Sequence, residues 1–154
     1  MHALNDIGAA HHQAPLVLGS TSPYRRALLA RLRLAFSVHA PMVDETAQAG
    51  EAPAALALRL ALQKANDVAT RHPAAVVIGA DQVAELDGQA IGKPGSHANA
   101  VAQLQAMRGR LVLFHSAVAV VRPATGFAQV LIAPVRVQFR PLSDAEIDHY
   151  LRLE

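Results

Sequence analysis

The chain has 154 residues, of which 52% are hydrophobic and 17% charged, so it is long enough to bury the core of a single domain. Its formal net charge of +2 is too small to indicate nucleic acid as a partner, and no apolar run approaches the ~18 residues of a membrane span. The absence of cysteine excludes disulfides and thiolate zinc sites and is compatible with a cytoplasmic location.

Residues 1–15 lack both a basic start and a long apolar segment, and we interpret them as a flexible N-terminal extension to a domain at residues 16–154. The first half of that domain predicts a buried strand at 16–19, a helix at 23–34, an extended piece at 36–39 and a helix at 53–70. Leu28, Leu29 and Leu32 are expected on the inner face of the first helix.

The second half predicts more strand than helix. A β-branched run at 76–86 turns at Asp87 and Gly88 and returns at 90–91, which is a hairpin pattern. Ser96 caps a helix that ends at Gly109, and strands at 111–121 and 129–139 form a long antiparallel pair. A capping box of Ser143 and Glu146 opens a last helix. This order predicts an α/β fold with a mixed, twisted sheet flanked by helices.

The segment 20–26, with the sequence STSPYRR, predicts a helix start that binds an anion. Ser22 stands at the N-cap and Pro23 at the first helical position. Arg25 and Arg26 then fall in the first turn, where the positive end of the helix dipole disfavours a cation. Backbone N–H groups, hydroxyls such as that of Ser20, and two guanidinium groups would together suit a phosphate. The alternative is a solvated arginine pair on an ordinary helix.

Asp81 stands in the middle of a run that otherwise predicts a buried strand. A carboxylate is costly to bury unless it is paired, hydrogen-bonded or bound to a metal ion. One interpretation is a strand distortion at Gly79 that turns Asp81 outward to solvent. The other is functional, with Asp81 binding a divalent cation, activating a water molecule, or both.

Three further charged residues are candidates for the same site. Lys64 is the one charge on the inward stripe of its helix, and it either extends past small alanines to water or reaches a ligand. Lys93 precedes Pro94, whose stiff backbone suits a rigid phosphate contact. Glu45 lies in a polar loop, where it is either solvated or shares a hard cation such as Mg²⁺ with Asp81.

Taken together, five segments resemble the Maf family of nucleoside triphosphate pyrophosphatases. They are STSPYRR from Ser20, VDET from Val43, the helix with Arg59, Leu60, Lys64 and Ala65, GADQV from Gly79, and GKP from Gly92. The resemblance implies an α/β protein that uses a divalent metal ion, Mg²⁺ or Mn²⁺. Its substrate would be a nucleotide, hydrolysed between the α- and β-phosphates to a nucleoside monophosphate and pyrophosphate.

The resemblance also implies roles for individual residues. Asp81 matches the family's catalytic proton acceptor and would hold the metal ion together with Glu45. The phosphate-binding residues would be Ser20, Arg25, Arg26, Lys64 and Lys93. Tyr24 and Gln82 would meet the base, and this pair is similar to the branch that acts on 7-methyl-GTP, whereas the dTTP/UTP branch typically has arginine and threonine at these places.

Two alternatives stay open at this point: dTTP or UTP as the substrate, and a non-catalytic nucleotide-binding regulator linked to septum formation. Family members often form dimers, so a homodimer is expected. Members usually continue beyond the equivalent of Glu154 with a glycine-containing segment that returns to the site. The C-terminal part of the fold is therefore expected to be missing from this chain.

Overall fold

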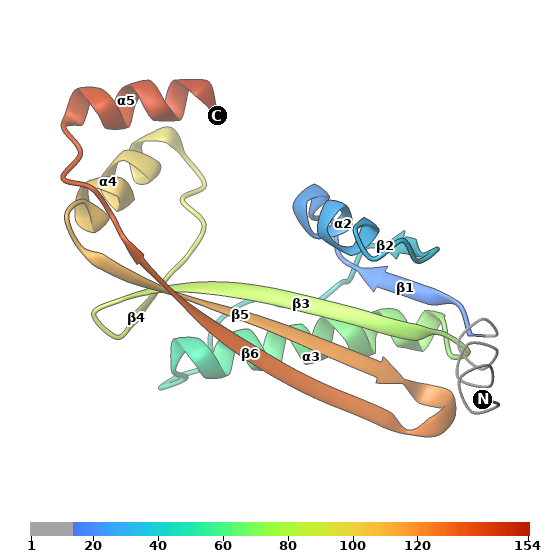
Figure 1. Cartoon of the computed structure of the whole chain (residues 1–154). Coiled ribbons are helices and arrows are strands. Elements are labelled where there is room, and N and C mark those ends of the chain that lie inside the picture. The colour runs from blue at the N-terminus through green and yellow to red at the C-terminus, as the bar shows by residue number, and fades with distance from the viewer. Residues whose placement is uncertain (1–13) are drawn as a thin grey trace, which may run out of the picture.

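The computed structural model describes residues 14–154, so most of the predicted N-terminal extension, residues 1–13, lies outside the described residues. The described part forms a six-stranded sheet with helices around it (Figure 1). Its elements in chain order are β1 (Leu16–Gly19), α2 (Pro23–Ala30), β2 (Ser37–His39), α3 (Pro53–Arg71), β3 (Val76–Leu86), β4 (Gln89–Ile91), α4 (His97–Met107), β5 (Leu111–Arg122), the 3-10 turn η1 (Pro123–Thr125), β6 (Phe127–Gln138) and α5 (Asp144–Leu153).

The sheet is mixed, as the sequence predicts. Its strand order is β2-β1-β3-β5-β6, and β4 pairs with β3 outside this path. The β1 strand is parallel to both β2 and β3, whereas β3 pairs antiparallel with β4 and β5, and β5 with β6. The α/β fold class with helices flanking the sheet is confirmed.

The core lies between α3 and the sheet face formed by β1, β3 and β5. Helix α3 runs along these strands (Figure 1) and presents Ala57, Ala61 and Ala65, each 0% exposed. A Cβ atom at Gly79 would stand 2.3 Å from the Ala61 carbonyl oxygen and 2.5 Å from the Ala65 nitrogen. Gly79 therefore allows the helix backbone to approach the strand closely.

The strand itself is not distorted at this glycine. The β3–β5 ladder is continuous, with Gly79 opposite Ala119 and Asp81 opposite Ala117. The interpretation that a distortion turns Asp81 to solvent is wrong, because the residue stays on the face that α3 covers and is 7% exposed.

One edge of β3 has a gap in its pairing. β1 pairs with β3 as far as Gly79, and β4 pairs with β3 from Ala84 onward. Residues 80–83 thus have no strand partner on this edge within residues 14–154. Because β1 ends here and α2 begins a few residues later, the gap brings a strand end, a helix start and the middle of β3 to one place.

Helix α2 differs from the expectation. It ends at Ala30 rather than near Leu34, and the chain turns at Arg33, whose φ is 57°. None of its residues is buried. Leu28 is 60% exposed, Leu29 is half-buried, and Leu32, beyond the end of the helix, is 64% exposed, so the predicted inner leucine face is wrong. The reason is that α2 lies near β1 and β2 (Figure 1) with a hollow on each side, so that Leu28 lines a cavity instead of packing into the core.

The remaining helices, α4 and α5, lie together at the far end of the long strands (Figure 1). Ser96 caps α4, and Ser143 with Glu146 forms the predicted capping box at the start of α5. Ile147 of α5 is 0% exposed, and Arg108 Nη1 contacts Asp144 Oδ1 at 2.7 Å. None of the helices described has the length and apolar character needed to cross a membrane.

Candidate functional site

A cavity of about 1000 Å³ occupies the gap beside β3. It is lined by the turn after β1, the start of α2, the loop after β2, helix α3, the middle of β3, β5 and β6, and the loop after β4. Eight of the nine residues that the sequence assigns to the site line it: Ser20, Tyr24, Arg25, Glu45, Lys64, Asp81, Gln82 and Lys93.

Lys64 joins the two predicted carboxylates. Its Nζ donates to Asp81 Oδ1 at 2.8 Å and to Glu45 Oε1 at 2.7 Å. The side chains of Lys64 and Asp81 are 11% and 8% exposed, whereas that of Glu45 is 47% exposed. Lys64 therefore does not extend past the alanines to bulk water. It supplies the counter-charge that makes the burial of Asp81 tolerable.

The positive charges converge on Glu45. The hydrogen bond from Lys64 lowers the pKa of Glu45 below its ordinary value, and the charges of Lys64, Lys93 and Arg25 add to this effect against the opposing effect of burial. A second hollow of about 500 Å³, toward β4, is lined by the same Arg25, Lys64 and Lys93 with both carboxylates. Three cations from different parts of the chain thus surround two carboxylates.

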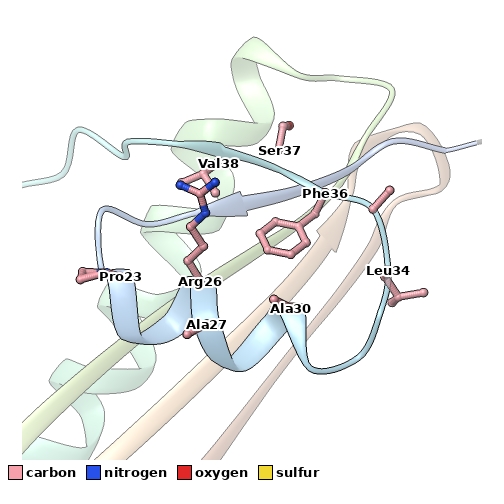
Figure 2. A pocket seen from close by; sticks show the side chains of 9 residues that line it. Pro23, Arg26, Ala27, Ala30, Leu34, Phe36, Ser37 and Val38 are labelled. Atoms are coloured by element: carbon pink, nitrogen blue, oxygen red, sulfur yellow. The ribbon is translucent and has the colours of Figure 1, made fainter.

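Arg26 is the predicted site residue that the structure places elsewhere. It lines a hollow on the other side of α2, where its side chain rises toward Val38 of β2 (Figure 2). Successive helical residues are turned by about 100° from one another, and this turn directs Arg26 away from the cavity that Tyr24 and Arg25 line. The expectation that the two guanidinium groups converge is therefore wrong for Arg26.

The helix start has the predicted cap. The Ser22 hydroxyl accepts a hydrogen bond from the Arg25 backbone N–H at 3.3 Å, and the Ser20 hydroxyl accepts one from the Ser22 N–H at 3.0 Å. Ser20 is 4% exposed, so its hydroxyl is held at the base of the cavity. These contacts aim the first turn of α2 and its positive dipole end at the gap beside β3.

Tyr24 and Gln82 line the more open part of the cavity. The Tyr24 side chain is exposed, with the residue 79% accessible, so its ring is available for stacking. The Oε1 atom of Gln82 accepts a hydrogen bond from the Ser116 hydroxyl at 3.1 Å, which leaves the amide nitrogen free to turn toward a ligand. Sequence reasoning missed Ser116, because only the register of β3 with β5 brings it opposite Gln82.

The donor set fits a hard divalent cation. Glu45 and Asp81 provide carboxylate oxygens that already converge on one positive group, the Lys64 ammonium. Within residues 14–154 no group of three or more His, Asp or Glu side chains is arranged to hold a metal ion. Mg²⁺ typically takes one or two protein carboxylates and completes its shell with water and substrate phosphates, so two carboxylates meet its requirement.

This arrangement suits phosphate chemistry. Arg25, Lys64 and Lys93 can neutralise the charge of bound phosphate groups, and the carboxylates can orient a water molecule or accept its proton. The alternative interpretation of the segment 20–26 as an ordinary solvated helix start does not account for the shared cavity.

Comparison with known proteins shows the family of the chain. The family model described as Maf-like protein matches residues 15–154. The 7-methyl-GTP pyrophosphatase of Albidiferax ferrireducens is 66% identical over 142 residues, covering 92% of this chain and 71% of that protein. Proteins of the same name from Polaromonas sp. and Cupriavidus metallidurans are 61% and 59% identical and are covered over 64% and 70% of their length. The chain therefore belongs to the Maf-like protein family.

Proposed function

We propose that this chain hydrolyses 7-methyl-GTP between the α- and β-phosphates, releasing 7-methyl-GMP and pyrophosphate, and so removes a modified nucleotide. The observation that carries the proposal is the bridge from Lys64 to both Glu45 and Asp81 in a cavity that Arg25 and Lys93 also line. The high identity to relatives named 7-methyl-GTP pyrophosphatase supports the choice of substrate.

In this proposal the cations bind the triphosphate. Arg25, Lys64 and Lys93 approach it from α2, α3 and the loop after β4, and the Ser20 hydroxyl lies at the base of the same cavity. Arg26 has no part in phosphate binding, because it lines the separate hollow over β2. Neutralising phosphate charge lowers the barrier to attack by water more than covalent help would.

The carboxylates act on the attacking water. Asp81 accepts its proton, and Glu45 helps to orient it from the half-exposed side of the cavity. Mg²⁺ or Mn²⁺, held by Glu45 and Asp81, would polarise the phosphate oxygens. Lys64 holds both carboxylates in place through its two hydrogen bonds.

Tyr24 and Gln82 recognise the base. Methylation at N7 makes the guanine ring cationic, and a flat cation stacks well on the exposed Tyr24 ring. The Gln82 amide, oriented by Ser116, offers donors to the edge of the base. A cytoplasmic location and a homodimer stay predictions from the family resemblance.

The proposal is tested by measuring pyrophosphate release from 7-methyl-GTP, GTP, dTTP and UTP with Mg²⁺ or Mn²⁺. We expect 7-methyl-GTP to be preferred and Asp81→Asn to abolish its turnover. Asn66→Ala, an exposed change on the same helix as Lys64, is the control that keeps wild-type turnover. Preference for dTTP or UTP would overturn the substrate assignment. Tight nucleotide binding without hydrolysis would overturn the enzymatic assignment in favour of a regulator.

A further inference from the structure

The polar face of α3 carries a stripe of four residues spaced four apart, Arg59, Gln63, Asp67 and Arg71, which we call the anchor stripe. Its members contact one another along the helix. Arg59 Nη1 donates to Gln63 Oε1 at 3.0 Å, and Arg71 Nη2 donates to Asp67 Oδ2 at 3.1 Å. The proposed chemistry uses none of them.

The anchor stripe holds the segment 40–51, which joins β2 to α3 and contains no helix or strand. On the N-terminal side of Glu45, Asp67 Oδ2 accepts from the Met42 backbone N–H at 2.8 Å, and Arg71 Nη2 donates to the Ala40 carbonyl oxygen at 2.8 Å. These contacts attach the start of the segment to the C-terminal half of α3.

On the C-terminal side of Glu45, Arg59 attaches the segment by three hydrogen bonds. Its Nη2 donates to the Thr46 carbonyl oxygen at 3.1 Å and to Glu51 Oε1 at 2.8 Å, and its Nε donates to Glu51 Oε2 at 2.6 Å. The Glu51 side chain is only 9% exposed. A bidentate arginine–carboxylate pair imposes a defined geometry that a single contact would not.

Glu45 therefore lies between two anchored points. Its own side chain is 47% exposed, and Lys64 is the group that it contacts in the cavity. A segment without regular structure would otherwise sample many conformations, and ordering each of its residues costs backbone entropy. The stripe supplies the contacts that offset this cost on both sides of Glu45.

We propose that Arg59 and Asp67 are positioning residues that hold the segment 40–51 on α3 so that the Glu45 carboxylate meets Lys64 and the bound nucleotide. This inference deepens the proposed function and rests on it for its catalytic consequence. The structural part of the inference concerns the segment alone. The competing interpretation is that the stripe merely stabilises the surface of α3.

The test compares Arg59→Gln, Glu51→Gln, Asp67→Asn and the control Asn66→Ala by hydrogen–deuterium exchange of residues 42–51. We expect faster exchange in this segment for the first three variants, with unchanged protection of β3 and β5. Arg59→Gln and Glu51→Gln remove the same ion pair from opposite sides. Combining them should therefore loosen the segment little more than the more severe of the two changes does.

For 7-methyl-GTP turnover we expect Arg59→Gln to lower kcat about 10- to 100-fold while KM changes little, because displaced catalytic groups affect the reaction more than binding. Unchanged exchange in Arg59→Gln and Asp67→Asn would overturn the proposal, as would a loosened segment with normal kcat. If the wild-type chain releases no pyrophosphate from any nucleotide, the proposed function fails. The exchange measurements then still decide whether the stripe positions the segment.

Discussion

Replacing Lys64 by methionine tests the electrostatic centre of the site. Methionine retains an unbranched, largely apolar side chain but removes the ammonium, which leaves Asp81 buried without its cation. Asp81 is 7% exposed, and no other ion pair to it is present in residues 14–154. Removing one partner of a buried ion pair typically costs about 3–5 kcal/mol in the free energy of unfolding.

Asp81→Asn should be milder, because Lys64 keeps its contact with Glu45. The amide oxygen can still accept a hydrogen bond, so we expect a loss of about 1–2 kcal/mol. In the double variant Lys64→Met/Asp81→Asn the buried charge is gone from both sides. Its loss in the free energy of unfolding should therefore be about 2 kcal/mol smaller than the sum of the two single losses, as expected for residues in direct contact.

Urea unfolding followed by far-ultraviolet circular dichroism measures these effects, since the chain has no tryptophan for fluorescence. With an m-value of about 2 kcal/mol/M, the Lys64→Met loss corresponds to a fall of about 1.5–2.5 M in the unfolding midpoint. Asn66→Ala is the exposed control on the same helix. A Lys64→Met loss below about 1 kcal/mol, or strictly additive single effects, would refute the buried-pair reasoning.

Three further predictions follow from the geometry. Gly79→Ala should lower the free energy of unfolding, measured in a thermal unfolding assay, by about 3 kcal/mol or more, because the new Cβ would stand 2.3 Å from a carbonyl oxygen of α3. In the same assay Gly92→Ala should be nearly neutral, because open space surrounds that position. Ser116→Ala removes the hydrogen bond that orients the Gln82 amide, so kcat/KM should fall for 7-methyl-GTP but not for UTP. Equal losses for the two substrates would contradict a role of Gln82 in base recognition. The pKa of Glu45 is lowered chiefly by the hydrogen bond from its lysine partner, so the carboxylate stabilises the fold above the ordinary glutamate pKa of 4.5. The difference in the free energy of unfolding between wild type and Glu45→Gln should therefore vanish as the pH falls through the lowered pKa. A difference that does not change with pH would contradict this account of Glu45.

The sequence predicted the features that depend on near neighbours in the chain. The caps at Ser96 and Ser143, the turn at Asp87 and the hairpin strands all appear as expected. Each relies on contacts within a few residues, such as a hydroxyl that accepts from an N–H three positions later. Such contacts can be read directly from residue types and spacing.

The candidate site was predictable only as a set of residues. The motifs identified Lys64 and Asp81 separately, and the family resemblance placed them in one site. The direct ion pair between Lys64 and Asp81, and the exposure of Leu28 and Leu32, are evident only from the packed structure. The choice between Arg25 and Arg26 likewise depended on which side of α2 faces the gap in β3.

By itself the sequence determined the order of strands and helices, the capped helix starts and the chemical types available for a phosphate site, because local propensity and hydrogen bonding act over a few residues. The tertiary structure decided the rest: the β3–β5 register that sets Ser116 against Gln82, the approach of α3 at Gly79, and the hydrogen bonds from Arg59 to Thr46 and Glu51. These contacts join segments distant in the chain, and they depend on packing and strand register that no local pattern encodes.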